Sequence, residues 1–479
     1  MTDAREAREK VEDHALTSVP VEQRKSWASL SWNTVGIVTT LVALYVGALM
    51  TFVAGFWMGV LGGVIVTFVG SALAWGMGHI AYRSGLASGL VARRHGFGRK
   101  GSVMLSSIFG FMMIGFIAAE NVLLYKGFIF FFGLEETLTS RILVYGTLTA
   151  IWIGLTTYGF DVVSRFSSIM LIGFLIMLFY MLAFIMLTTD QSWTDVLSFQ
   201  TQMPSDALHA LGVHSTADKL VFCINLLAGS LGALALLSAD LGRYARSSAD
   251  IGAAVVLGGS TLGIFMVSLG GILMYAGMPI LVEHYASVRG LPEQQAIQVA
   301  VQDPNHLAAA FIVIGGTIGG ILVVAAQAKA QVINTYSSSL SLSNFFDAIF
   351  AWQPGRFVFV VLANLLSLLL LYGDMLSWFH SFLKVLGILT TSFAGIILAD
   401  YFIVGRLAQR WQLALQKDEM INWAGIVTIP TAFILAHIVL SSIIRVEILT
   451  GLAVAFILYP VLRLSVLRPM RCSKDTRAA

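Results

Sequence analysis

Apolar residues in this chain form long continuous runs that are separated by short polar segments. Twelve of these runs, between residues 32 and 462, are long enough to form a helix of about 20 residues that crosses a bilayer. They lack the alternation of apolar and polar residues that marks the strands of a membrane β-barrel. The pattern therefore predicts an all-α membrane protein with 12 transmembrane helices.

Small residues interrupt two of the apolar runs near their middle, at residues 45–51 in span one and 229–232 in span six. Glycines are poor helix formers, and a span that lines a polar cavity can open there to hold a solute. Two such spans five apart predict an inverted repeat with discontinuous helices 1 and 6. The alternative is that these small residues merely let helices pack closely. On the first interpretation the solute pocket includes Gly47, Ala48, Gly229 and Ser230.

The polar segments divide the chain and orient it in the membrane. Lys and Arg are concentrated in the first arm, in the segment that follows span two, in the linker after span ten and in the tail. By the positive-inside rule this pattern predicts a multi-pass protein of the inner (plasma) membrane with both termini in the cytoplasm. The expected parts are a cytoplasmic arm (1–30), a first repeat of helices 1–5 (31–188), a second repeat of helices 6–10 (218–402), helices 11–12 (421–465) and a cytoplasmic tail (466–479).

Composition narrows the functional class. Of 479 residues, 57% are hydrophobic and 11% are charged, whereas a soluble domain has roughly 25% charged residues. The two cysteines, Cys223 and Cys472, predict neither a disulfide framework nor a metal site. H-E-x-x-H and G-x-S-x-G motifs are absent from the sequence, so an enzyme is not expected. We expect no cofactor apart from a coupling ion, and no nucleic-acid partner.

Ionisable residues within spans are costly and usually functional, and the candidates of this kind are Glu120, Lys329 and Lys384. Desolvation favours the neutral form of a buried carboxylate, so Glu120 of span three could carry a coupling proton or bind a cationic or donor-rich solute. The alternative is a structural pair between Glu120 and Lys329. Lys384 of span ten is assigned to snorkelling or helix pairing. Span six ends with Asp240, Arg243 and Arg246. These residues form either a gate or a solvated helix end, and we favour the second interpretation.

Three amides recur on one face of span eight, at spacings of four and three residues. Gln327, Gln331 and Asn334 both donate and accept hydrogen bonds, which suits the edge of a heterocycle. Hydrogen bonding between helices is the competing interpretation.

Five short motifs follow one another along the membrane region. They are HGFGRKGS at 95–102, DLGRYARS at 240–247, NTYSSSLS at 334–341, ADY at 399–401 and INW at 421–423. Their order and placement resemble the nucleobase:cation symporter-1 family, particularly its cytosine and purine permeases. The resemblance implies a five-plus-five inverted-repeat fold with two added helices. It also implies import of nucleobases, hydantoins, allantoin or related heterocycles with Na⁺ or H⁺.

The resemblance assigns further residues and shows two departures from the family. Family members sandwich the heterocycle between aromatic residues of spans three and six; here these positions are Phe116 and Leu231, so one aromatic face remains. Beside them, Glu120 and Asn121 complete the expected solute site. At the position of the span-eight sodium ligands stand Lys329, Ala330 and Gln331. An ammonium there would occupy the volume and charge of a sodium ion.

The sequence therefore predicts a secondary active transporter that imports a cytosine- or purine-type base by alternating access, with H⁺ favoured over Na⁺ because of Lys329. The alternatives are transport of another small polar or cationic nitrogen compound, such as allantoin, a hydantoin or a small amine, and a solute receptor without net transport. The partners expected are the small solute and the lipid bilayer, and the oligomeric state stays open.

Overall fold

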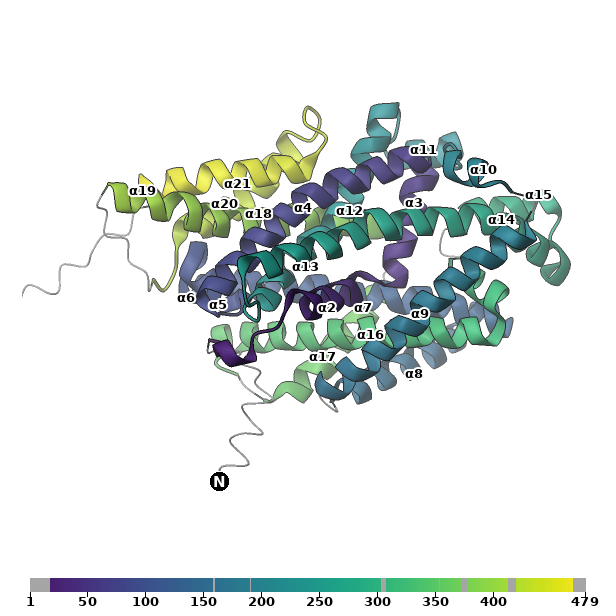
Figure 1. Cartoon of the computed structure of the whole chain (residues 1–479), viewed down its shortest axis with the longest axis horizontal. Coiled ribbons are helices and arrows are strands. Elements are labelled where there is room, and N and C mark those ends of the chain that lie inside the picture. The colour runs from purple at the N-terminus through teal and green to yellow at the C-terminus, as the bar shows by residue number, and fades with distance from the viewer. Residues whose placement is uncertain are drawn as a thin grey trace, which may run out of the picture.

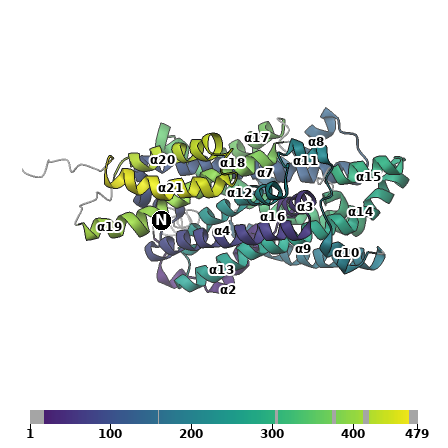
Figure 2. The same cartoon turned by 90° about the horizontal axis from the view of Figure 1, so that it is seen from above.

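The helices of this protein run mostly along one long axis and form an elongated bundle (Figures 1 and 2). The computed structural model describes residues 18–157, 160–189, 191–302, 307–352, 354–372, 378–411 and 419–467. Within these residues all regular structure is helical, apart from an isolated bridge between Lys25 and Ala245. The predicted all-α class is therefore confirmed. Cys472 and most of the expected tail lie outside the described residues.

The first part of the chain supplies the elements up to the long polar loop. They are η1 (Val21–Gln23), α2 (Trp27–Val38), α3 (Leu41–Ala54), α4 (Phe56–Ser84), α5 (Ser88–Ala92), η2 (Arg93–Phe97), α6 (Gly98–Gly101), α7 (Val103–Phe132), α8 (Leu138–Thr157), α9 (Phe160–Thr188), α10 (Trp193–Ser198) and α11 (Ser205–Ala210).

The second part begins with a central helix and ends with a pair at one edge of the bundle. Its elements are α12 (Thr216–Gly242), α13 (Ser248–Ser260), η3 (Thr261–Met266), α14 (Val267–Arg289), α15 (Glu293–Gln302), α16 (Leu307–Phe350), α17 (Arg356–Tyr372), α18 (Phe379–Ala399), η5 (Asp400–Val404), α19 (Gly405–Arg410), α20 (Trp423–Phe433), η6 (Ile434–Val439) and α21 (Glu447–Leu464).

Among the described residues, the helices that qualify as membrane spans by their length and composition are fewer than the 12 that the sequence predicts. Among the described residues nine helices are long and apolar enough to cross a membrane, or up to ten if the bent pair α2 and α3 is one span. The expected count of 12 is therefore not confirmed. Two shorter apolar helices, 356–372 and 423–439, occupy the positions expected for spans nine and eleven.

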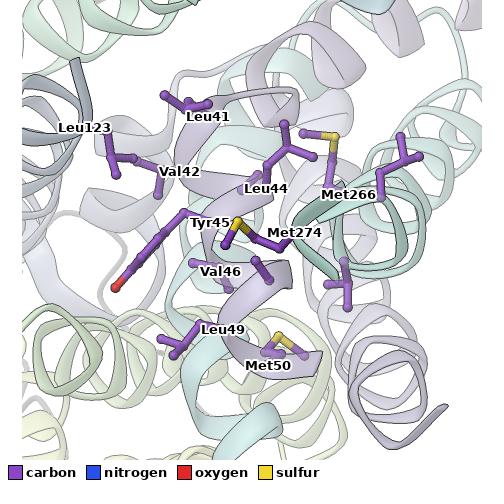
Figure 3. Close-up of a cluster of buried hydrophobic side chains, with 14 of the residues drawn as sticks. Leu41, Val42, Leu44, Tyr45, Val46, Leu49, Met50, Leu123, Met266 and Met274 are labelled. Atoms are coloured by element: carbon purple, nitrogen blue, oxygen red, sulfur yellow. The ribbon is translucent and has the colours of Figure 1, made fainter. Parts of the chain in front are cut away.

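Span one is broken, as expected, but at a different place. Helices α2 and α3 meet at 65°, with Thr39 and Thr40 between them. The Thr39 hydroxyl donates to the Val35 carbonyl at 2.6 Å, and the Thr40 side chain accepts from the Ala43 N–H at 3.1 Å, which caps the start of α3. Residues 45–51, where we expected the break, lie inside the continuous, buried helix α3 (Figure 3).

Span six is not discontinuous, and here the prediction is wrong. Helix α12 continues from Thr216 to Gly242 through the Gly229–Gly232 stretch. A Cβ at Gly229 would overlap the Leu383 carbonyl of α18, and one at Gly232 would overlap the Thr390 hydroxyl. The glycines serve close packing of α12 on α18, because the absent side chains let the two backbones approach.

Gly47 of α3 has the same packing role. A Cβ there would overlap the backbone of Val267 in α14. We therefore expect Gly47→Ala to destabilise the protein by about 1–3 kcal/mol through overpacking, measured as a lower thermal midpoint in detergent. The control is Gly146→Ala on α8, where the added Cβ meets nothing within 4 Å. Equal midpoints for both variants would contradict this packing.

Two groups of helices enclose the centre of the molecule. Helix α12 packs against α4, α18 and α3, and α3 in turn packs against α14. On the other side α16 packs against α7, α9 and α17 (Figure 1). The bend between α2 and α3 lies where these groups meet, since α3 also contacts α7 and α16.

The segment that precedes α2 packs on the bundle. The Val19 N–H donates to the Gly85 carbonyl at 3.0 Å, and the Lys25 N–H donates to the Tyr244 carbonyl at 2.6 Å. The Arg246 guanidinium donates to the Arg24 carbonyl at 3.1 Å. These contacts join the described part of the arm to the ends of α4 and α12.

The end of α12 is packed against its neighbours at Asp240 and Arg243, so the expected solvated helix end is wrong for these two residues, whereas Arg246 is exposed. Asp240 accepts hydrogen bonds from the Ser88 N–H at 2.8 Å and the Ser88 hydroxyl at 3.0 Å, at the start of α5. Arg243 is buried and its guanidinium lies over the Tyr244 ring. The Asp240 carboxylate thus ties span six to the segment after span two.

Candidate functional site

A pocket lies beside the bend of span one, between the two groups of helices. Four polar residues line it, from the bend, α7, α12 and α16. The lining consists of Ile37, Val38, Thr40, Val42, Ala43, Met113, Phe116, Glu120, Ser230, Ala233, Leu234, Leu237, Leu262, Ala330, Ile333 and Asn334. Four residues of the predicted solute site, namely Phe116, Glu120, Ser230 and Asn334, therefore converge on one cavity.

The other predicted solute residues lie elsewhere. Gly47 and Ala48 face α14, and Gly229 faces α18. The side chain of Leu231 lies outside the described residues. Asn121, Gln327 and Gln331 are fully buried and are not part of the pocket lining.

Glu120 is the ionisable residue that lines the pocket among the described residues. Its side chain is 2% exposed, and its Oε2 atom has no hydrogen-bond partner within the described chain. The amide of Gln327 lies beside this carboxyl group. No ion pair joins Glu120 to Lys329 in the described structure, so the alternative of a structural pair is wrong. A buried carboxylate without a cation is costly unless a proton or a solute compensates it.

Asn121 and Gln331 hold helices together. Gln331 Nε2 donates to the Ile117 carbonyl and to Asn121 Oδ1, both at 3.1 Å. The Trp152 indole N–H donates to the same Asn121 oxygen at 2.9 Å. For these two residues, the interpretation as hydrogen bonds between helices describes the contacts that the structure shows.

Lys329 belongs to α16 but stands on a different face of that helix from the three amides. Its ammonium group lies near the C-terminal end of α2. The side chain is 6% exposed, and a Cβ at Gly36 of α2 would overlap its ammonium group. Leu171 of α9 borders the same point. Across the described chain, no carboxylate forms an ion pair with this lysine.

The backbone at the end of α2 suits a cation. The Thr40 N–H donates to the Val38 carbonyl, and the Leu41 N–H donates to Gln327. The carbonyls of Gly36 and Ile37 thereby lose the donors that a continuing helix would give them. Such carbonyls, at the negative end of the helix dipole, favour a positive charge. The Lys329 ammonium lies beside Gly36, near this end of α2.

Lys384 pairs with a neighbouring helix, which confirms the expected helix pairing. Its ammonium lies 2.5 Å from Glu447 Oε1, and His437 Nδ1 lies 2.6 Å from Glu447 Oε2. These residues join α18, η6 and α21 and are not part of the pocket lining. We did not single out Glu447 from the sequence, although a carboxylate at the start of an apolar span was a usable signal.

Three of the sequence motifs meet at one end of the bundle, away from the pocket. His95 Nδ1 lies 3.0 Å from Asp400 Oδ2, and the Tyr459 hydroxyl donates to Asp400 Oδ1 at 2.6 Å. Asn422 Nδ2 donates to the Tyr459 hydroxyl at 3.0 Å, and the Asn422 N–H donates to the Phe97 carbonyl at 2.8 Å. These motifs therefore fix α20 and α21 to the rest of the fold.

Taken together, the broken first span and the pocket beside it characterise the fold. The fold is that of the membrane transporters built on a five-plus-five inverted repeat. These neighbours are transporters rather than enzymes.

The similarity to individual structures extends over almost the whole chain. The inward-facing conformation of Mhp1 superposes with a TM-score of 0.68 at 17% identity, covering 95% of this chain and 97% of that one. Mhp1, a nucleobase-cation-symport-1 family transporter, in a closed conformation with bromovinylhydantoin bound gives 0.66 at 16% identity, covering 94% and 95%. The resemblance to this family is confirmed at the level of the fold.

A more distant neighbour is a Na⁺-coupled sialic acid symporter in a substrate-bound outward-open state. Its TM-score is 0.59 at 13% identity, with 95% of this chain and 92% of that chain covered. No family model matches the sequence, and no curated protein matches it significantly.

Proposed function

We propose that the protein is a cation-coupled secondary transporter that imports a small nitrogenous heterocycle of the cytosine or purine type. The observation that carries this proposal is the pocket at the bend of span one, which joins a buried carboxylate to an aromatic ring and an amide. A bent first helix beside a pocket suits alternating access, because small movements of α2 against α3 can open or close the pocket.

The lining matches the chemistry of a flat nitrogen heterocycle. Phe116 offers one ring face for stacking and is held edge-on by Phe382, with ring centroids 6.3 Å apart. Asn334 can both donate and accept along the edge of the heterocycle, and the Ser230 hydroxyl can do the same from the opposite helix. Glu120 accepts hydrogen bonds from ring N–H or amino groups.

A second candidate is another small polar or cationic nitrogen compound, such as a hydantoin, allantoin or a small amine. The Glu120 Oε2 atom, which has no hydrogen-bond partner within the described chain, favours the small amine in particular, because a cationic solute would neutralise the carboxylate directly. The neighbour Mhp1 was solved with bromovinylhydantoin bound. Both candidates use the same pocket, and of the solutes named only the small amine carries a positive charge.

We propose H⁺ as the coupling ion. The Lys329 ammonium lies at the end of α2, where the freed carbonyls would otherwise be available to a metal cation. Glu120 then carries the proton in the membrane. The sialic acid symporter is Na⁺-coupled, whereas we assign H⁺ to this protein. The reason for the different assignment is the charged side chain of Lys329.

We further propose that the protein resides in the inner (plasma) membrane with both termini in the cytoplasm. The placement of Lys and Arg supports this orientation. The His95 and Asn422 motifs would then lie at the cytoplasmic end, and the Lys384–Glu447 pair at the outer end.

Uptake into proteoliposomes tests these proposals. Radiolabelled cytosine, adenine, a hydantoin and a small amine are each offered under an imposed pH gradient, with and without a Na⁺ gradient. We expect accumulation driven by the pH gradient alone, and none in liposomes without protein. Saturable binding without accumulation would instead identify a solute receptor, and accumulation that requires Na⁺ would contradict proton coupling.

A further inference from the structure

Gln327 lies between the bend of span one and the carboxyl group of the pocket. Its Oε1 atom accepts a hydrogen bond from the Leu41 N–H at 3.5 Å, across 286 positions of sequence. Its Nε2 atom has no hydrogen-bond partner within the described chain, and the amide lies beside Glu120. The side chain is fully buried. One amide thus faces both the start of α3 and Glu120.

The Leu41 N–H is a donor that the bend has released. In a continuous helix it would bond to the Ile37 carbonyl, but at the start of α3 it has no such partner. The Thr40 side chain caps a different donor, the Ala43 N–H. Gln327 therefore satisfies the freed Leu41 donor in a place from which water is largely excluded, where an unpaired donor is costly.

The orientation of this amide depends on the charge of Glu120. An ionised carboxylate accepts a hydrogen bond from Nε2, which holds Oε1 toward Leu41. A protonated carboxyl group can instead donate to Oε1 and compete with the Leu41 N–H. A solute that pairs with the carboxylate draws it away from Nε2. Each change at Glu120 alters the support that Gln327 gives to the bend.

We propose that Gln327 is a positioning residue that couples the occupancy of Glu120, by proton or solute, to the bend between α2 and α3, which presupposes that the pocket is the transport site. Gln331, one turn further along α16, bonds to α7 through Ile117 and Asn121. Among the described residues it forms no hydrogen bond with α3, so it is the matched control for an amide that serves packing alone.

A double-mutant cycle tests the coupling without any solute. A reporter cysteine is placed at the bend by Ile37→Cys, which lines the pocket, in a background that carries Cys223→Ser and Cys472→Ser. The rate of its modification by a small thiol reagent is measured in the full-length protein in liposomes. Glu120→Gln mimics the neutral carboxyl group, and its effect on the rate is compared with Gln327 intact and with Gln327→Leu.

With Gln327 intact we expect Glu120→Gln to change the rate about threefold or more, as for directly coupled residues. With Gln327→Leu we expect less than about half of that change, whereas Gln331→Leu should leave the full effect. Monodisperse elution checks folding, and Gln327→Met, of similar length, replaces the leucine variant if that one fails. An equal effect of Glu120→Gln in all three backgrounds overturns the proposal, as does the absence of any effect with Gln327 intact.

The double-mutant cycle and the uptake assay test different claims, so a negative result in one does not decide the other. If uptake occurs but the cycle is additive, only the role of Gln327 falls. If the cycle shows coupling but no tested solute accumulates, the positioning role stands and the assigned solute class falls.

Discussion

Glu120→Gln is expected to weaken solute binding by about 10- to 150-fold, which corresponds to the 1.5–3 kcal/mol of a hydrogen bond to a charged group. The substitution keeps the size of the side chain and removes its charge. The substitution should also flatten the dependence of the uptake rate on external pH. In the unmodified protein, proton-driven uptake falls as external pH rises, because Glu120 is no longer reloaded with a proton. Solute binding and initial uptake rates across external pH measure both effects.

The matched control for this variant is Glu136→Gln. Glu136 lies in the segment between α7 and α8, is partly exposed and pairs with Lys126 at 2.7 Å, away from the pocket. We expect it to bind and transport normally. If Glu120→Gln retained both the affinity and the pH profile of the unmodified protein, Glu120 would have no part in the mechanism.

Lys329→Ala is expected to reduce proton-driven uptake by at least about tenfold, because it removes the cation that lies beside Gly36 near the end of α2 and leaves a cavity in the core. Gly36→Ala should act in the same direction with the lysine still present, since the added Cβ would displace its ammonium group. Initial uptake rates under a pH gradient, with and without Na⁺, measure the effect.

Lys126→Ala, which removes a half-exposed lysine, serves as the control and should transport normally. The thermal midpoint of each variant separates a loss of transport from a loss of folding. Full proton-driven uptake by both Lys329→Ala and Gly36→Ala would show that the ammonium group is not needed at the end of α2.

Part of the pocket could be predicted because its residues are unusual for a membrane span. Glu120 stood out as a carboxylate in an apolar helix, and Asn334 as part of a polar stripe on α16. Phe116 and Ser230 followed from the family resemblance and from the glycines beside Ser230. The structure places these four residues on one cavity.

The break in span one shows why the rest could not be read from the sequence. Small residues are needed where a helix opens and also where two helices approach closely, so Gly47 and Gly229 carried an ambiguous signal. The structure assigns both to close packing. The actual bend lies at Thr39 and Thr40, whose hydroxyls satisfy backbone groups locally. A pair of threonines in an apolar run was the available signal.

The polar stripe on α16 was predicted as a unit, but its members have separate roles. Asn334 lines the pocket, Gln331 bonds to α7, and Gln327 accepts from the Leu41 N–H at the bend. The helical period places all three on one side, and only the position of α7 and α3 decides which partner each amide meets.

The sequence by itself determined that this is a helical membrane protein and that charged groups are buried inside it, because long apolar runs and intramembrane carboxylates allow few other solutions. Only the tertiary structure decided where span one bends, that span six stays continuous, and that the ammonium of Lys329 lies at the end of α2. These features depend on contacts between segments far apart in the chain, whose geometry no local pattern encodes.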